Sequence, residues 1–211
     1  MGLLNLLTRD PLAFALVAIP LLFSVIIHEV AHGWVAYRMG DSTAKWSGRL
    51  SLNPLKHLDP VGTLMLFLAG FGWAKPVPVN FNNLSDKRNG LIFVSLAGIL
   101  ANILFAFFAL LFFRLFSASF PGANLHLAYK VCQSVAYINI TLAALNLIPI
   151  PPLDGSKILM GILWERTPDF FFRLEPYGFF VIIGLLFLGI LDPLIGFFGW
   201  MIGTMIGILL P

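Results

Sequence analysis

Long stretches without a charged side chain are the feature that most limits how this chain can fold. Leu91–Phe113 holds 23 consecutive uncharged residues and Val131–Ile150 holds 20. About 20 apolar residues suffice for a helix to cross the hydrocarbon core of a bilayer. Over all 211 residues, 59% are hydrophobic and only 11% are charged, against about 25% charged in soluble domains. The sequence therefore predicts an integral membrane protein and excludes a disordered chain or an ordinary soluble enzyme.

The uncharged runs predict an all-α polytopic membrane protein with about five transmembrane helices. We expect Pro20 to kink the first span and the last two spans to form a tight helical hairpin. Residues 1–211 are predicted to form a single membrane domain, without a repeat or a soluble accessory domain. The five predicted spans are Pro11–Met39, Leu91–Phe113, Val131–Ile150, Pro176–Leu191 and Pro193–Leu210.

The segment between the first two spans has a different character. Ser47–Leu52 alternates loosely between polar and apolar residues and predicts a short strand. Val61–Ala74 is apolar but only 14 residues long, which favours a re-entrant or interfacial segment over a span. Prolines in Lys75–Asn80 exclude a helix and favour extended chain. We therefore expect a small membrane-associated β or re-entrant insertion here.

The positive charges predict how the chain is oriented in the cell membrane. Cytoplasmic loops of membrane proteins carry an excess of Lys and Arg. If Val61–Ala74 does not cross, ten such residues lie on one side, and Arg9, Arg114 and Lys130 lie on the other. This predicts an N-terminus outside and a C-terminus inside. The ten are Arg38, Lys45, Arg49, Lys56, Lys75, Lys87, Arg88, Lys157, Arg166 and Arg173. Met1–Asp10 lacks the basic region of a signal peptide, so we expect no cleaved signal peptide.

Neither the net charge nor the cysteine content suggests another class of protein. The formal net charge is only +3 and the basic residues are scattered, so no nucleic-acid-binding surface is predicted. The single cysteine, Cys132, excludes an intramolecular disulfide and a zinc cluster built from several thiolates.

The run from His28 to His32 carries the clearest chemical signal. Its sequence is His-Glu-Val-Ala-His, at the end of the first predicted span. On a helix, two histidines four residues apart lie on one face, where both can bind one zinc ion. In such motifs the glutamate, here Glu29, is the general base for the water that zinc activates. Ionisable residues in a membrane helix are expensive and are by default candidates for function.

Asp154 is the best candidate for a third zinc ligand. It follows the proline-rich turn after Val131–Ile150, on the predicted cytoplasmic side that also holds His28 and His32. Two histidines and a carboxylate would leave one coordination position open for water. Alternatively, Asp154 could cap a short interfacial helix. The ligand set favours zinc, although cobalt or iron would also fit.

Two distant motifs together give a specific resemblance to a family. The histidine motif at His28–His32 is followed by N-x-x-P-x-x-P-L-D-G at Asn146–Gly155. This combination resembles the site-2 protease family of intramembrane zinc metalloproteases. Asn53–Pro60, Gly72–Asn80 and Ala97–Asn102 resemble its compact prokaryotic branch, which has no PDZ domain. Members often carry a second glycine after the aspartate-glycine pair, where this chain has serine.

The resemblance implies a function and roles for named residues. It implies one Zn²⁺ per chain, held by His28, His32 and Asp154, with Glu29 as the base. It also implies a substrate that is itself a transmembrane helix, cut within or near the cytoplasmic half of the bilayer. Asn146 would lie near the metal, where its amide can help to stabilise the oxyanion.

Several weaker signals and two rival functions stay open at this point. His57 and Asn102 are candidates for a supporting role beside the metal ligands. Glycines 199, 203 and 207 could let helices approach closely, either within the chain or between protomers of a homo-oligomer. The same ligands could serve a metal transporter, but a transporter has no need of a base at Glu29. A catalytically inactive relative that acts as a membrane chaperone is the third possibility.

Overall fold

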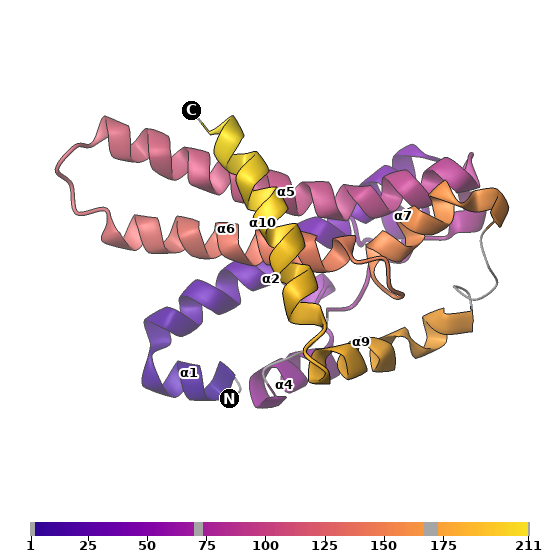
Figure 1. Ribbon diagram of the computed structural model, residues 1–211, viewed down its shortest axis with the longest axis horizontal. Helices are drawn as coiled ribbons and strands as arrows, with labels where there is room; N and C mark the ends of the chain where they lie inside the picture. The colour runs from indigo at the N-terminus through magenta and orange to yellow at the C-terminus, as the bar shows by residue number, and fades with distance from the viewer. Residues whose placement is uncertain (1–2, 70–73, 167–172, 211) are drawn as a thin grey trace.

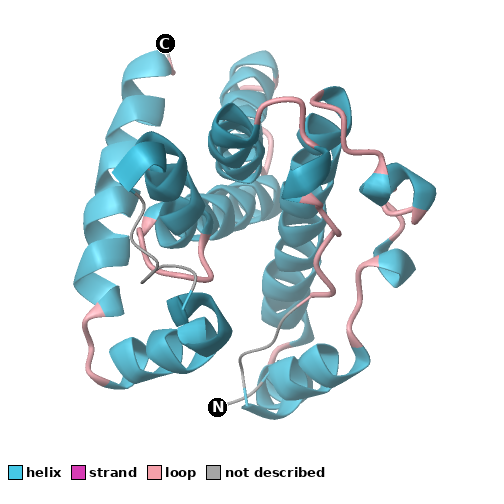
Figure 2. Cartoon of the chain, turned by 90° about the vertical axis from the view of Figure 1, so that its right-hand side faces the viewer, coloured by secondary structure: helices cyan, strands magenta, loops and turns pink. Residues whose placement is uncertain are grey.

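The computed structural model describes residues 3–69, 74–166 and 173–210, whose regular structure is entirely helical (Figure 2). This confirms the predicted all-α class. The α-helices are α1 (Leu3–Arg9), α2 (Pro11–Arg38), α3 (Thr43–Trp46), α4 (Pro60–Ala69), α5 (Lys87–Ser119), α6 (His126–Leu147), α7 (Asp154–Ile162), α9 (Gly178–Phe187) and α10 (Leu191–Leu209). Short 3-10 helices are η1 (Pro54–Lys56), η2 (Phe81–Asn83), η3 (Trp164–Arg166) and η4 (Glu175–Tyr177).

Three long helices form the body of the molecule. α5 and α6 make an antiparallel hairpin, α2 packs against both, and α10 crosses the hairpin obliquely (Figure 1). Small side chains in the core let the helices approach closely, as is usual where lipid supplies no hydrophobic force between helices. The buried core residues include Ala106, Ala136, Ala143, Ala144, Ile99, Ile202 and Ile206.

The first span begins and continues as its sequence predicts. The Asp10 side chain caps α2 by accepting a hydrogen bond from the Ala13 N–H at 2.9 Å, and Pro11 occupies the first turn. Pro20 lies inside the helix and has no N–H to bond the Leu16 carbonyl. The Ser134 hydroxyl on α6 donates to that carbonyl instead. The proline thus creates an acceptor that joins α2 to α6.

Three of the five predicted spans, α2, α5 and α10, are helices long and apolar enough to cross a membrane. α6 has 22 residues, enough to cross a bilayer, but its composition is more polar. It ends at Leu147 because Ile148 precedes a proline and is extended. α9 has only ten residues, so the prediction of a full span over Pro176–Leu191 is wrong.

The predicted hairpin of the last two helices is also wrong. The break falls at Gly189, whose φ of +68° ends α9 before Asp192 is reached. Asp192 and Pro193 instead lie in the first turn of α10, where an acidic residue and a proline are both favourable. The two helices meet at a wide angle and do not pair along their lengths (Figures 1 and 2).

The insertion between α2 and α5 consists of loops and short helices, so the strand predicted at Ser47–Leu52 is wrong. Gly48 has a φ of +64°, which ends α3 in a turn. Within the described residues, the only β-type pairing in the insertion is an isolated bridge between Leu58 and Ala74. α4 is ten residues long, too short to cross, as expected for a segment that does not span. Residues 70–73 lie outside the described residues, and they include Gly72 and Trp73 of the Gly72–Asn80 motif.

A buried carboxylate holds this insertion together. Asp41 is fully buried and accepts hydrogen bonds from the Thr43 backbone and hydroxyl, the Asn83 amide and the Asn80 N–H. Arg49, also buried, donates to the Lys75 carbonyl at 2.5 Å. These bonds fix the extended chain before η2 next to α2, and that chain forms one wall of the site.

Candidate metal centre and active site

The two motif histidines lie on one face of α2, as their spacing predicts. The imidazole rings are perpendicular, with centroids 4.5 Å apart, and the two Nε2 atoms are 2.9 Å apart. His28 is 7% exposed and His32 is 9% exposed. Two buried nitrogens this close to each other are costly unless a shared cation or proton lies between them.

Asp154 reaches the same point from a distant part of the chain. α6 ends at Leu147, the chain turns, and α7 begins with Asp154 in its first turn. Gly155 makes the turn possible, because a Cβ there would lie 2.4 Å from the Leu147 carbonyl oxygen. The Oδ2 atom of Asp154 is 3.1 Å from Nε2 of both His28 and His32. The third predicted ligand therefore lies beside the first two.

These three side chains form a group that can hold a metal ion. One ligand atom from each converges on one point, and all three residues are buried. Two imidazole nitrogens and one carboxylate oxygen are the donor set of a catalytic zinc site with an open fourth position. Burial alone would raise the pKa of Asp154, but the two imidazoles beside it hold this pKa well below its usual value.

The second nitrogen of His32 is held in place by the backbone of α5. Nδ1 of His32 lies 2.6 Å from the Val94 carbonyl oxygen. Since a carbonyl can only accept, Nδ1 carries the proton and Nε2 keeps its lone pair for a metal. This is the usual second contact of a metal-binding histidine. Nδ1 of His28 is buried but has no hydrogen-bond partner among the described residues.

Gly98 lets α5 pack directly against the histidine pair. A Cβ at this position would lie 2.5 Å from His32 Nε2 and 2.6 Å from His28 Cε1. Any larger residue would displace the rings. The sequence contains Gly98 within a stretch that resembles the family, but its role becomes visible only from the contact between the two helices.

The Glu29 carboxylate is anchored by the extended chain of the insertion. Its Oε2 atom accepts a hydrogen bond from the Val77 N–H at 2.7 Å. Val77 is buried and packs against Gly33 of α2. Glu29 itself is half-buried and lines the same cavity as the histidines and Asp154. The sequence does not predict this role of Val77, because the contact uses a backbone N–H and not the side chain.

A cavity of about 520 Å³ contains the metal-ligand group, Glu29 and Asn146. The amide nitrogen of Asn146 donates to the Leu142 carbonyl at 3.0 Å, one turn earlier in α6, which fixes the orientation of the side chain. That amide has a second N–H, so it can also donate to a group in the cavity. Asn146 therefore lines the same cavity as the candidate metal ligands.

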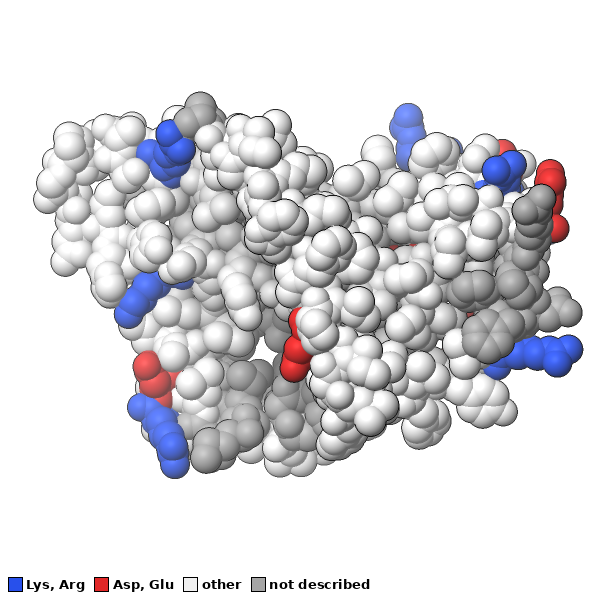
Figure 3. All heavy atoms as spheres, viewed as in Figure 1, with Lys and Arg blue, Asp and Glu red and all other residues white. Residues whose placement is uncertain are grey.

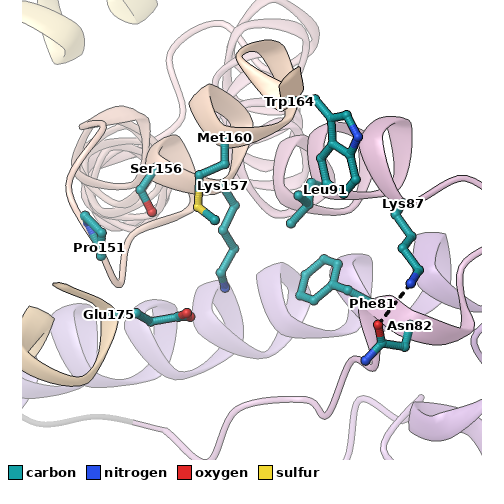
Figure 4. A pocket seen from close by; sticks show the side chains of 10 residues that line it. All are labelled: Phe81, Asn82, Lys87, Leu91, Pro151, Ser156, Lys157, Met160, Trp164 and Glu175. Atoms are coloured by element: carbon teal, nitrogen blue, oxygen red, sulfur yellow. Dashed lines mark hydrogen bonds between the residues drawn. The ribbon is translucent and has the colours of Figure 1, made fainter. Parts of the chain in front are cut away.

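A second cavity of about 360 Å³ adjoins the first, between α5, α7 and η4 (Figure 4). Phe81, Lys157 and Glu175 line both cavities. The Lys157 and Glu175 side chains point toward each other, and the Lys157 amine lies 6.0 Å from the centre of the Phe81 ring. The remaining walls are largely apolar, with Leu91, Met160 and Trp164. The first cavity, called the catalytic cavity below, thus continues past Lys157 into a mainly apolar space.

The two candidates for supporting roles lie in different places. His57 is fully buried, but its Nε2 bonds the Ser51 carbonyl at 2.7 Å and it lines a separate cavity beside α2. The structure therefore does not bring His57 to the metal ligands. Asn102 is fully buried on α5, one turn beyond Gly98, and does not line the catalytic cavity.

A buried His₂-carboxylate group with a carboxylate base in the same cavity defines the class of site found in zinc metallopeptidases. Comparison with known proteins agrees with this class. The profile of Peptidase family M50 matches residues 120–189, which include Asp154 but not the histidine motif. No solved structure matches the chain.

Two relatives extend the similarity over most of the chain. "Putative zinc metalloprotease YwhC" of Bacillus subtilis is 40% identical over 172 residues, covering 79% of this chain and 78% of the relative. "Putative zinc metalloprotease Rip2" of Mycolicibacterium smegmatis is 31% identical over 178 residues, covering 82% and 67%. The chain belongs to peptidase family M50, the site-2 protease family of zinc metalloproteases.

Proposed function

We propose that this chain is an intramembrane zinc endopeptidase that hydrolyses transmembrane-helix substrates within or near the cytoplasmic half of the bilayer. His28, His32 and Asp154 hold the zinc ion and Glu29 is the general base. The observation that carries this proposal is the convergence of three ligand atoms, from α2 and α7, in a buried cavity that also contains Glu29.

The residues of the chain have distinct parts in the proposed reaction. Glu29 takes a proton from the attacking water and later passes it to the leaving amine. The Val77 N–H holds one carboxylate oxygen of Glu29, which leaves the other free to face the water. Asn146 donates a hydrogen bond to the developing oxyanion. When bound by His28, His32 and Asp154, zinc would supply the Lewis acidity that this hydrolysis needs.

The position of the site supports a substrate that lies in the membrane. Both histidines are in a helix whose length and composition suit a span, and the cavity lies between such helices. On the face in Figure 3, Lys and Arg side chains gather at the two ends of the long axis, and the surface between them is white except for an acidic patch near the middle. This distribution favours a bilayer around the middle of the molecule, with the site toward the end that holds α7.

The rival functions receive less support. A metal transporter would need further ionisable residues along a path through the membrane, whereas the metal group described here stands alone among the described residues. Membership of a metalloprotease family also favours hydrolysis over transport or chaperone activity.

The metal assignment is tested by measuring zinc in the purified protein. We expect about one zinc per chain in the wild type and in Glu29→Gln, and little in His28→Ala or Asp154→Ala. His57→Ala is the matched control and should keep its zinc. Zinc retained by Asp154→Ala would contradict the ligand assignment.

The substrate class is tested in proteoliposomes with a model transmembrane protein whose products are identified by mass spectrometry. We expect cleavage inside or beside the membrane segment, abolished by a zinc chelator and in Glu29→Gln. Cleavage only in water-exposed loops would be consistent with a metalloprotease but would refute the proposal that it cuts within the membrane.

A further inference from the structure

A second group of polar side chains lies buried between α2, α5 and α6. Ser24, Asn102 and Asn139 are each 0% exposed. None of them lines the catalytic cavity. A polar group buried in a membrane protein costs several kcal/mol unless it is hydrogen-bonded. These side chains therefore need partners.

Some of these partners are already in place. The Asn139 amide donates to the Ser24 hydroxyl at 2.7 Å and to the Val135 carbonyl at 2.8 Å. The Ser24 hydroxyl in turn donates to the Pro20 carbonyl at 2.6 Å. These bonds use both N–H groups of Asn139 and leave its Oδ1 atom without a partner among the described residues. Both amide atoms of Asn102 are unpartnered as well.

The register of α2 against α5 indicates that Asn102 lies toward this group and toward His28. His32 bonds the Val94 carbonyl, and Gly98 contacts both histidine rings, so the two helices run antiparallel. One turn further along α5 is Asn102, and one turn back along α2 from His28 is Ser24. Asn102 therefore lies on the face of α5 that continues from Gly98 toward Ser24.

The unpartnered atoms are complementary in kind. His28 Nδ1 must carry a proton when its Nε2 binds a metal, so it is a donor. Asn102 offers an acceptor oxygen and an amide nitrogen with two N–H groups, and Asn139 Oδ1 is an acceptor. Pairing His28 Nδ1 with Asn102 Oδ1, and Asn102 Nδ2 with Asn139 Oδ1, satisfies every one of these atoms.

We propose that Asn102 is a positioning residue for the metal centre. Its carbonyl oxygen accepts a hydrogen bond from His28 Nδ1, and its amide is held by Asn139, which is anchored to Ser24. Small side-chain rotations or buried water close these contacts. Asn102 thereby supports His28 in the same way as the Val94 carbonyl supports His32. The inference rests on the proposed role of His28 as a zinc ligand.

Zinc affinity in the detergent-purified protein is the first test. Loss of such a supporting contact weakens metal binding by about 10- to 100-fold in other proteins, and we expect a loss of this size in Asn102→Leu. Asn102→Asp keeps the acceptor oxygen but loses the N–H that Asn139 holds, so it should retain more zinc affinity than Asn102→Leu. The structural control is Ser134→Ala, which removes a different bond between α6 and α2. It should lower thermal stability without weakening zinc binding.

The second test reads the histidine directly and needs no activity. The sequence has only four histidines, so ¹⁵N-labelled imidazole signals can be assigned one by one. We expect a hydrogen-bonded Nδ1–H signal from His28 in the zinc-loaded wild type and its loss or shift in Asn102→Leu.

The possible failures are distinguishable. Folded Asn102→Leu with wild-type zinc affinity and an unchanged His28 signal would overturn the inference alone. An equal loss of affinity in Ser134→Ala would also overturn it, because the effect would then reflect general packing. Zinc retained in His28→Ala would overturn both the inference and the ligand assignment on which it rests.

Discussion

His32 and Glu29 are each held in place by one hydrogen bond to the backbone. Val94 holds His32 through a backbone carbonyl, and Val77 holds Glu29 through a backbone N–H. Both contacts come from the main chain, so the identity of the contributing side chain carries no sequence signal. Substitutions that alter the backbone or the space around it are therefore the informative ones at this scale.

Gly98→Ala tests the close approach of α5 to the ligands. The added Cβ would lie 2.5 Å from His32 Nε2, so the ring must move and the ligand geometry is lost. We expect zinc affinity to fall at least about tenfold. Gly203→Ala is the control, because a Cβ there meets no atom within 4 Å among the described residues. Equal zinc binding by both variants would argue against the packing described for Gly98.

Val77→Pro tests the anchor of the general base. Proline removes the N–H that Glu29 accepts from, while an apolar ring still occupies the buried position. Because small misplacements of a catalytic group are costly, we expect cleavage to fall about 10- to 100-fold with zinc content unchanged. Val77→Ala keeps the N–H and should be far more active than Val77→Pro. Equal activities would show that the hydrogen bond has no catalytic role.

The insertion between α2 and α5 forms one wall of the site, and polar contacts keep it in place. Its segments have little regular structure, so buried hydrogen bonds to Asp41 and from Arg49 take over the role that helix or sheet bonding has elsewhere. The extended chain at Val77 keeps its position beside α2 through these bonds.

Asp41→Asn tests this role of the carboxylate. Burial alone would raise the pKa of Asp41, but hydrogen bonds from Thr43, Asn83 and Asn80 lower it below the usual 3.8. A carboxyl group with a lowered folded-state pKa stabilises the fold above its unfolded pKa, and this stability disappears as the pH falls through the folded pKa. At neutral pH we expect Asp41→Asn to lose about 1–3 kcal/mol of unfolding free energy.

Thermal unfolding of the metal-free protein between pH 7 and pH 2 checks this expectation. Below about pH 4 the wild type should lose stability more steeply than Asp41→Asn, so the two curves should converge. Parallel curves over the whole range would mean that Asp41 makes no pH-dependent contribution.

Lys and Arg lie toward the two ends of the long axis on the face in Figure 3, and this distribution predicts the orientation of the molecule in the membrane. The turn between α5 and α6 lies at one end of the long axis and α7 lies at the other (Figure 1). The excess of Lys and Arg around the α7 end predicts that this end faces the cytoplasm. The outside position of the N-terminus and the side of the C-terminus stay predictions.

Cysteine labelling in intact cells tests this orientation. In a Cys132→Ala background, the exposed Asn124 and Ser47 are each replaced by cysteine. We expect a membrane-impermeant maleimide to label Asn124→Cys in intact cells and Ser47→Cys only after permeabilisation. The reverse pattern would invert the proposed topology.

The predicted association through glycines 199, 203 and 207 also belongs to this scale. A Cβ at Gly203 or Gly207 would meet no atom within 4 Å among the described residues, and one at Gly199 would only touch Ile140. The described part of the chain therefore does not use this face for close internal packing. Homo-oligomerisation through these glycines stays a prediction.

The sequence alone determined what depends on local spacing and on solvent. Uncharged runs long enough to cross a bilayer fixed the all-α membrane class, and the four-residue spacing of His28 and His32 fixed their common face. The sequence overestimates the length of the helix at Gly178–Phe187, because apolar residues continue past Gly189. The backbone conformation at Gly189, and not a change in composition, ends this helix.

Only the tertiary structure decided which distant groups support the metal site. Asp154 was proposed as a third ligand from sequence, but its 3.1 Å approach to both histidines depends on the turn after α6. The Val94 carbonyl, the Val77 N–H and the space at Gly98 depend on how α2, α5 and the insertion pack together. Backbone groups occur at every position, so only their arrangement in space distinguishes those that serve the site from those that do not.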